Sequence, residues 1–346
     1  MDIEPKDDRE RLIRGEEAEE EAVFNISLRP ESLDNFVGQK HVIENVNIAI
    51  KAAKQRKESL EHVLLSGPPG LGKTTLAHII SHEMGAKITA TSGPAIERAG
   101  DLIGILTNLG EGDILFIDEI HRLSKVVEEF IYPAMENYQI DFLIDKGPYA
   151  KTIKFNLKRF TLIGATTRAG LLSAPLRGRF GMFYHLDFYE AEDLVKIIER
   201  SAELLSIPID KDAAVEIACR SRGTPRVANR LLRRVRDYSE VKGNKKIDKD
   251  IAVNGLASHR IDSAGLDDID RKVVKAIIDF YDGGPVGIES LAATLNEESD
   301  TIVDVVEPFL LKIGFLKRTP RGREVTKLAY DHLKVPYKKE SQKEMF

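Results

Sequence analysis

The segment SGPPGLGKTT, residues 66–75, constrains the fold of this chain more than any other stretch. Gly67, Gly72, Lys73 and Thr74 match the G-x-x-x-x-G-K-[ST] pattern of a phosphate-binding loop. Glycines at this spacing let the backbone curl so that successive N–H groups point at phosphate oxygens, and the following helix adds its positive end. We expect Lys73 to place its charge between the β- and γ-phosphates and the Thr74 hydroxyl to bind Mg²⁺.

The residues on either side of the loop indicate a strand and a helix. Residues 62–65 form a short run typical of a buried strand, and apolar residues then recur at helical spacing until Gly85. A strand, the loop and a helix in this order are the context that the motif requires. The alternative, a chance Gly/Pro turn between two elements, would not need that context.

Further strand and helix patterns alternate after the loop. Residues 87–91, 114–117 and 161–165 are strand candidates, and residues 101–109 have a helical pattern. This alternation predicts an α/β fold with a parallel sheet covered on both faces, whose ligand binds at the carboxyl ends of the strands. Residues from three separate segments are expected at that edge: Gly67, Asp118 and Thr167.

Two acids and two threonines follow these strands. Asp118 can hold the Mg²⁺ shell, as the Walker-B aspartate does, and Glu119 can polarise an attacking water. The alternative is a strand that ends in solvated acids. Thr166 and Thr167 end the next strand, where a hydroxyl can sense the γ-phosphate; Thr167 is slightly favoured.

Two features of this part of the chain stay open at the sequence level. Residues 140–157 alternate around Gly147-Pro148, which suggests a β-hairpin; Ile153 and Phe155 either form an exposed tip for a partner or belong to the core. Arg179 follows the sensor strand too far along the sheet to reach its own nucleotide. It either acts on the nucleotide of a neighbouring subunit as an arginine finger or makes a surface salt bridge.

Composition limits what the rest of the chain can be. The net charge of −5 argues against a protein coated in positive potential, so DNA would need a local basic patch. Residues 312–339 provide one, with nine basic residues against two acidic ones. No stretch approaches a membrane span, so we expect a cytoplasmic protein without membrane contact. The single cysteine, Cys219, is expected to be buried.

The patterns predict four regions. An acidic arm, 1–27, precedes a large ATPase domain, 28–189, and a small helical lid domain, 190–260. In the lid, Thr224-Pro225 opens a helix whose first turn carries Arg226, where a bound phosphate would relieve the conflict with the helix dipole. Three helices and a hairpin in 261–346 predict a C-terminal winged-helix domain, with Pro308 kinking its third helix.

Five segments resemble the RuvB family of bacterial Holliday-junction branch-migration motors, members of the AAA+ class of ring-forming ATPases. They are GPPGLGKTT, LFIDEIHRLS (115–124), TLIGATTRAG (161–170), RGTPRVANRLLRRVRD (222–237) and FLKRTPRGR (315–323). The resemblance implies a P-loop AAA+ core that forms hexameric rings around duplex DNA, on each side of a junction held by RuvA. It also implies ATP hydrolysis with Mg²⁺, a role in recombination, DNA repair and the SOS response, and RuvC as a further partner.

The resemblance also assigns roles by position. Catalytic positions are Asp118, Glu119, Thr167 and Arg179, and Thr74 and Asp118 serve the metal. Positions near the nucleotide are Leu28, Arg29, Gly70, Gly72, Lys73, Thr74, Thr75, Glu136, Asn137, Tyr138, Tyr189 and Arg226. Arg318, Arg321 and Arg323 match the DNA-contacting wing, and Ile153 and Phe155 match the RuvA-contacting hairpin. Ser299 stands where members of the family carry an arginine, so that DNA contact is not carried over.

Two other functions fit the same motifs. A clamp or helicase loader acts on a protein ring, so its ATP turnover should depend on a clamp and little on junction DNA. An ATP-switched DNA-binding initiator also combines a phosphate loop with a winged helix, but it needs nucleotide binding more than turnover. The presence of Glu119 argues mildly against the initiator.

Overall fold

The structure, a computed structural model, describes residues 27–144, 151–243 and 245–337, without the side chains of 141–153. The predicted acidic arm therefore lies outside the described residues except for Ser27. The chain forms two compact units. The first contains residues up to 207 together with 224–230, and the second contains 208–223 and the residues from 231 onward. The predicted lid range, 190–260, is divided between them.

A five-stranded parallel sheet forms the centre of the first unit, which confirms the predicted α/β class. Its strand order is β2-β3-β6-β1-β7. The strands are β1 (Val63–Ser66), β2 (Ile88–Ser92), β3 (Ile114–Asp118), β6 (Thr161–Thr166) and β7 (Met182–His185). The three central strands are apolar almost throughout because both faces of a parallel sheet are covered. The edge strand β7 was not predicted.

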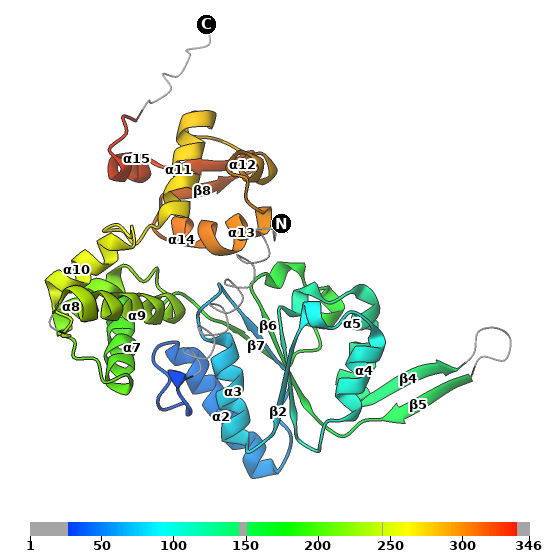
Figure 1. The fold of residues 1–346 in the computed structure, drawn as a ribbon. Helices are drawn as coiled ribbons and strands as arrows, with labels where there is room; N and C mark the ends of the chain where they lie inside the picture. The colour runs from blue at the N-terminus through cyan, green and yellow to red at the C-terminus, as the bar shows by residue number, and fades with distance from the viewer. Residues whose placement is uncertain (1–26, 145–150, 244, 338–346) are drawn as a thin grey trace, which may run out of the picture. The chain divides into compact units, whose positions relative to one another are not determined.

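Helices cover both faces of this sheet (Figure 1). The connection from β1 to β2 runs along the sheet in the opposite direction to the later connections, so right-handed crossovers place its helix on the opposite face. Figure 1 accordingly shows α2 (Lys40–Arg56) and α3 (Lys73–Met84) on one side and α4 (Ala99–Thr107) and α5 (Lys125–Asn137) on the other. The remaining elements are η1 (Gly93–Ala95), η2 (Ile120–Arg122), η3 (Ala169–Leu171), α6 (Ala174–Arg177) and α7 (Ala191–Leu204).

The predicted hairpin is present between α5 and β6. Strands β4 (Gln139–Ile144) and β5 (Lys151–Asn156) pair antiparallel with each other and form a sheet of their own. The N–H of Leu157 donates to the carbonyl of Tyr138 at 2.7 Å and closes the base of the hairpin.

The second unit begins with helices. They are α8 (Lys211–Cys219), most of α9 (Pro225–Lys242) and α10 (Lys249–Ser258). Cys219 is exposed, so the expectation of a buried thiol was wrong. Val215 and Cys219 lie four residues apart on the exposed face of α8, whereas Ala214, Ile217 and Ala218 form the buried face.

The described C-terminal residues form the predicted winged helix around an apolar core. Its elements are α11 (Asp268–Tyr281), α12 (Ile288–Leu295), α13 (Ser299–Thr301), η4 (Ile302–Val306), α14 (Glu307–Lys312), β8 (Leu316–Thr319), β9 (Gly322–Val325) and α15 (Lys327–Leu333). The predicted third helix is present as an uninterrupted helical run over residues 299–312, but its hydrogen bonding changes in the middle. Because Pro308 has no N–H to continue the α-helical ladder, the chain makes a wider π-helical turn, η4, ahead of it. None of the helices in the described ranges combines the length and apolar character of a membrane span.

Candidate nucleotide-binding site

A cavity of about 230 Å³ lies at the carboxyl ends of β1, β3 and β6 in the first unit. It brings together residues from segments that are far apart in the sequence. Twelve of the predicted site residues line it: Leu28, Arg29, Gly70, Gly72, Lys73, Thr74, Thr75, Asp118, Glu119, Thr167, Tyr189 and Arg226. The cavity therefore has the position that ligands take in open parallel sheets.

The phosphate loop between β1 and α3 has the backbone that its glycines allow. Gly67 has φ +135°, and a Cβ there would meet the carbonyl oxygen of Leu186. Lys73 is buried, and its Nζ donates to the carbonyls of Gly67 and Pro68, at 2.8 Å in each case. Burial lowers the pKa of Lys73 to about 8, although Asp118 opposes this shift. An anionic ligand would therefore stabilise the charged form of Lys73.

Oxygen ligands converge next to the loop. Thr74 Oγ1 lies 3.5 Å from Asp118 Oδ2. Hydroxyl and carboxylate oxygens are the ligands that Mg²⁺ prefers, and Mg²⁺ sites commonly use one or two carboxylates besides water and substrate phosphates. The residues present therefore fit a Mg²⁺ ion.

Glu119 follows Asp118 with an unusual backbone conformation. Its φ of +47° lies in the left-handed region, which non-glycine residues adopt rarely, mostly in turns and at functional sites. This turn ends the strand abruptly and presents Glu119 on the lining of the cavity. Arg122 Nη1 donates to its Oε2 at 3.0 Å.

The two threonines after β6 have different environments. Thr166 is fully buried; its Oγ1 lies 2.9 Å from His121 Nδ1 and accepts a hydrogen bond from the N–H of Arg168. Thr167, in contrast, lines the cavity. The geometry thus favours Thr167 as the residue that meets a ligand.

The opposite end of the cavity is lined by apolar and basic side chains. Leu28 and Phe36 come from the segment before α2, and Ile197 comes from α7. Arg200 Nη1 donates to the carbonyl of Leu28 at 3.2 Å and holds that segment in place. Arg200 and Asn229 were not predicted, although Arg200 lies three residues after Ile197 and so shares its helix face.

The site carries an excess of positive charge at short range. Burial and the neighbouring Arg226 both lower the pKa of the Arg29 guanidinium. Arg226 also lowers the pKa of Lys73, and its N–H donates to the carbonyl of Gly70 at 3.3 Å. Mutual repulsion of these cations favours a polyanionic ligand such as a triphosphate.

Four of the predicted catalytic and nucleotide-binding residues do not line the cavity: Arg179, Glu136, Asn137 and Tyr138. Tyr138 packs instead against His62 and Phe160. Arg179 Nη2 lies 3.1 Å from Glu136 Oε1, and Arg179 Nη1 donates to the carbonyl of Pro175 at 2.7 Å. Sequence motifs could not reveal that Arg179 and Glu136 pair with each other.

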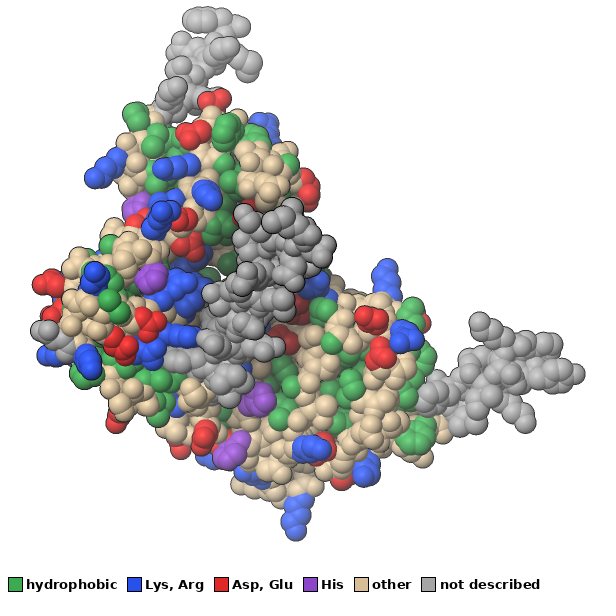
Figure 2. Space-filling model, viewed as in Figure 1, with side chains coloured by type: hydrophobic (Ala, Val, Ile, Leu, Met, Phe, Trp, Pro, Cys, Tyr) green, Lys and Arg blue, Asp and Glu red, His purple; other side chains and the backbone are tan. Residues whose placement is uncertain are grey.

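The wing arginines also have different environments. Arg318 makes two hydrogen bonds to the carboxylate of Glu307, at 2.6 and 2.7 Å, and Arg323 bonds to the same carboxylate. The Glu307 side chain is only 1% exposed, whereas Arg321 is exposed at the turn. On the face seen in Figure 2, basic and acidic side chains are interspersed over the surface. Phe155 is 45% exposed, but it pairs with Ile140 near the base of the hairpin, so its predicted position at the tip was wrong. The Ile153 side chain lies outside the described set.

Comparisons with known proteins match this chain along nearly its whole length. Residues 28–186 match a family model described as "Holliday junction DNA helicase RuvB P-loop domain", residues 189–262 match "RuvB AAA lid domain", and residues 263–334 match "RuvB C-terminal winged helix domain".

Individual proteins give the same result. The chain is 60% identical over 330 residues to the "Holliday junction branch migration complex subunit RuvB" of Dehalococcoides mccartyi (strain CBDB1), covering 95% of each chain. It is 58% identical over 333 residues to the protein of that name from Ligilactobacillus salivarius (strain UCC118), covering 96% of this chain and 99% of the relative. A solved structure titled "Thermotoga maritima RuvB Holliday junction branch migration motor" aligns with a TM-score of 0.84 at 52% identity, covering 90% of this chain and 99% of that one.

Proposed function

This chain belongs to the RuvB family, and we propose that it is an ATP-driven ring motor that moves duplex DNA during branch migration of Holliday junctions, together with RuvA. One observation carries the proposal: a single chain combines a cavity lined by buried cations with a winged helix whose C-terminal stretch, residues 312–339, is locally basic. A machine that couples ATP hydrolysis to movement of DNA needs both parts.

The cavity supports ATP hydrolysis by named residues. Lys73 and the loop amides would bind the phosphates, and Thr74 and Asp118 would hold Mg²⁺. An ion held by these two residues would supply positive charge that stabilises the negative charge developing on the phosphates. Glu119 would orient and polarise the attacking water, and Thr167 would contact the γ-phosphate. Leu28, Tyr189 and Arg200 line or support the opposite end, where the base would bind.

Arg179 supports action across a subunit boundary. It does not line the cavity of its own chain, yet it occupies the arginine-finger position of the resemblance. We therefore assign it to the nucleotide of a neighbouring protomer in a hexameric ring. Glu136, Asn137 and Tyr138 would lie at the same boundary, where Glu136 holds Arg179.

The remaining partners follow from the wing and the hairpin. Arg321 and Arg318 would contact phosphates of duplex DNA without reading its sequence, while Arg323 would chiefly orient the wing through Glu307. Phe155 and Ile153 would form the RuvA-binding face of β5. We assign the protein to the cytoplasm and to recombination and DNA repair, with RuvC as a further partner of the junction complex.

The experiment that tests this proposal is ATPase turnover with four-way junction DNA, with and without RuvA. A branch-migration motor should be stimulated by the junction and further by RuvA. Turnover that responds to a sliding clamp but not to junction DNA would instead identify a loader. Nucleotide binding without stimulated turnover would identify a switch of the initiator type.

A further inference from the structure

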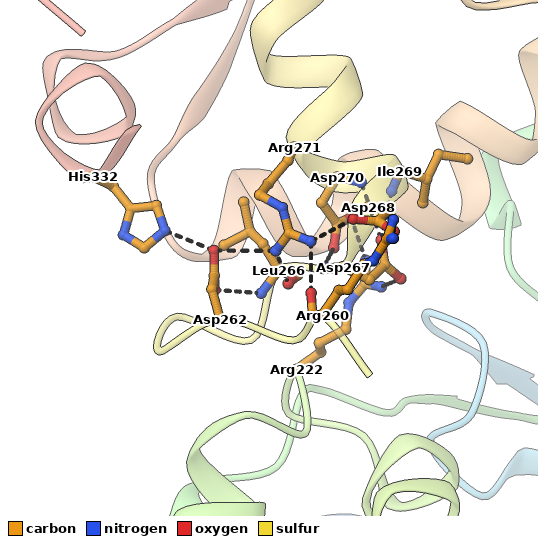
Figure 3. Close-up of polar contacts among 10 residues, drawn as sticks. All are labelled: Arg222, Arg260, Asp262, Leu266, Asp267, Asp268, Ile269, Asp270, Arg271 and His332. Carbon is orange, nitrogen blue, oxygen red and sulfur yellow. Dashed lines mark hydrogen bonds and ion pairs between the residues drawn. The ribbon is translucent and has the colours of Figure 1, made fainter. Parts of the chain in front are cut away.

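A buried ion-pair cluster joins the residues just before Arg226 to the first helix of the winged-helix head. We call it the lid–head cluster and define it as Arg222, Asp267, Asp270, the carbonyl of Val305 and the ring of Phe309. Arg222 Nη2 lies 2.8 Å from Asp270 Oδ1, and Arg222 Nη1 lies 3.2 Å from Asp267 Oδ2. The Arg222 guanidinium also lies 4.7 Å from the centre of the Phe309 ring. Figure 3 shows the arginine and the two aspartates pointing toward one another.

The two aspartates are themselves fixed at the start of α11. Asp267 Oδ1 accepts hydrogen bonds from the N–H groups of Ile269 and Asp270, and Asp270 Oδ2 accepts one from the N–H of Asp267. This reciprocal capping box leaves each carboxylate one oxygen for Arg222. A rotation of α11 relative to Arg222 would therefore break the charge-assisted hydrogen bonds that Arg222 makes with both aspartates.

Neighbouring contacts fix the chain that leads from the lid to the head (Figure 3). Arg271 donates to the carbonyls of Leu266 at 2.7 Å and Arg260 at 2.6 Å. His332 Nε2 lies 2.9 Å from Asp262 Oδ2, which connects α15 to the same segment. These contacts fix residues 260–266, which lead from the lid to the head, against α11 and α15, so this linker does not rotate freely. The head should therefore move with the lid residues that carry Arg222.

Arg222 also has a special place in the sequence. Three residues separate it from Arg226, which lines the nucleotide cavity and donates to the phosphate loop at Gly70. The boundary between the two compact units falls within this run, after Gly223. One short piece of backbone is thus anchored to the head on one side and to the phosphate loop on the other.

We propose that Arg222 is a positioning residue that couples the nucleotide state of the cavity to the orientation of the DNA-binding head. The inference rests on the proposed motor function. A displacement of Arg226 that accompanies hydrolysis would be passed along residues 223–225 to Arg222, and through its two aspartate contacts to α11. A buried pair suits this role because it fixes one orientation, whereas a purely apolar contact could slide.

The test compares DNA-stimulated and basal ATP turnover of the full-length protein in Arg222→Ala, Arg222→Lys and Asp267→Asn. Burial already raises the pKa of Asp270 to about 7, against the effect of Arg222, so Asp270 can become neutral when Arg222 is removed and the variant can fold. We expect basal turnover, ATP affinity and nucleotide-free DNA affinity to stay close to wild type. The ratio of stimulated to basal turnover should fall roughly fivefold or more, the lower end of typical coupling factors.

The matched control is Arg260→Ala. Arg260 pairs with Asp268 in the same region, but its side chain is 77% exposed and it is not attached to the run that ends at Arg226. This variant should keep the wild-type ratio. Retention of the wild-type ratio by folded Arg222 variants would overturn the inference. Equal loss of basal and stimulated turnover would also overturn it, because Arg222 would then only stabilise the fold. A wild-type protein without DNA-stimulated turnover would refute the motor function itself.

Discussion

Arg179 and Glu136 form an ion pair, with 3.1 Å between Nη2 and Oε1, and the Arg179 guanidinium lies 4.3 Å from the centre of the Tyr132 ring. These contacts fix the position of the Arg179 side chain, which does not line the cavity of its own chain. Arg179→Ala should therefore bind ATP normally yet lose a factor of ~10³ or more in turnover, as is typical of finger residues. Arg177→Ala, an exposed arginine on the neighbouring helix α6, is the control.

Mixed rings decide whether Arg179 acts in trans. Arg179→Ala subunits mixed with Lys73→Ala subunits should regain some turnover, because each mutant supplies the group that its neighbour lacks. The measurement is turnover across mixing ratios, with incorporation of both variants verified. Absence of rescue at every ratio would contradict action across the boundary.

Binding and chemistry should separate at the phosphate loop and the strand end. Lys73→Ala should weaken nucleotide binding, because the ligand loses its buried cation. Glu119→Gln should still bind ATP but hydrolyse it far more slowly, since only activation of the water is lost. Equilibrium binding of labelled ATP and single-turnover rates test both, with Glu129→Gln on the exposed face of α5 as control. Wild-type turnover in Glu119→Gln would refute its assignment.

The wing arginines should differ in what they contribute. Arg321→Ala should leave the melting temperature unchanged and lower the salt slope of duplex binding by at most ~0.9 for one lost phosphate contact. Arg323→Ala should lower the melting temperature, because the buried Glu307 loses one of its two charged partners. Alanine at all three positions, Arg318 included, should weaken binding equally for unrelated sequences. An unchanged slope in that triple variant would mean that the protein contacts DNA phosphates through other residues.

The hairpin should bind RuvA through one face of β5. Ile153→Glu together with Phe155→Glu should abolish the complex, because charges replace the apolar side chains of one strand face. Lys154 lies on the opposite face of β5, so Lys154→Ala should bind RuvA normally. Complex formation and thermal melting are measured together. A double variant that melts far below wild type would show that these residues stabilise the fold instead.

His62 predicts a loss of stability in acid. It is buried, its Nδ1 accepts from the N–H of Leu162 at 2.8 Å, and its Nε2 lies 3.1 Å from the carbonyl of Met135. Burial lowers the pKa of His62, so the unfolded chain binds a proton more readily than the folded one. Stability should therefore fall as pH drops below ~6.5. In His62→Gln, the free energy of unfolding should depend less steeply on pH between pH 5 and 7. A slope equal to that of wild type would exclude His62 as a source of the acid-induced loss of stability.

Strong local patterns explain why the central sheet and the phosphate site could be predicted from the sequence. The apolar runs of β3 and β6 and the glycine spacing of the loop are local patterns, so a few consecutive residues are enough to predict each element. Strand β7 was missed because it is a short edge strand whose side chains alternate between intermediate and exposed. The exposure of Cys219 was misjudged because a helix pattern does not reveal which face meets a neighbour.

Other parts of the site depend on tertiary packing. Arg200 is one arginine on a helix rich in charge, and no pattern distinguishes it from a solvated one. The pairing of Glu307 with Arg318 and Arg323 joins residues 11 and 16 positions apart, and it appears only once the wing folds back on α14. Thr166 and Thr167 likewise needed the buried contact with His121 to be told apart.

Strands β4 and β5 form a sheet separate from the central sheet, so the outer part of the hairpin can be replaced without breaking hydrogen bonds of the central sheet. Its strands are hydrogen-bonded to each other, and its base is closed by the contact between Leu157 and Tyr138. Ile140 at the start of β4 belongs to the core of the first unit, so it has to stay. Exchange of residues 141–155 for a hairpin of another sequence should leave the pairing of β1, β3 and β6 untouched. The outer part of the hairpin can therefore be altered independently of the central sheet.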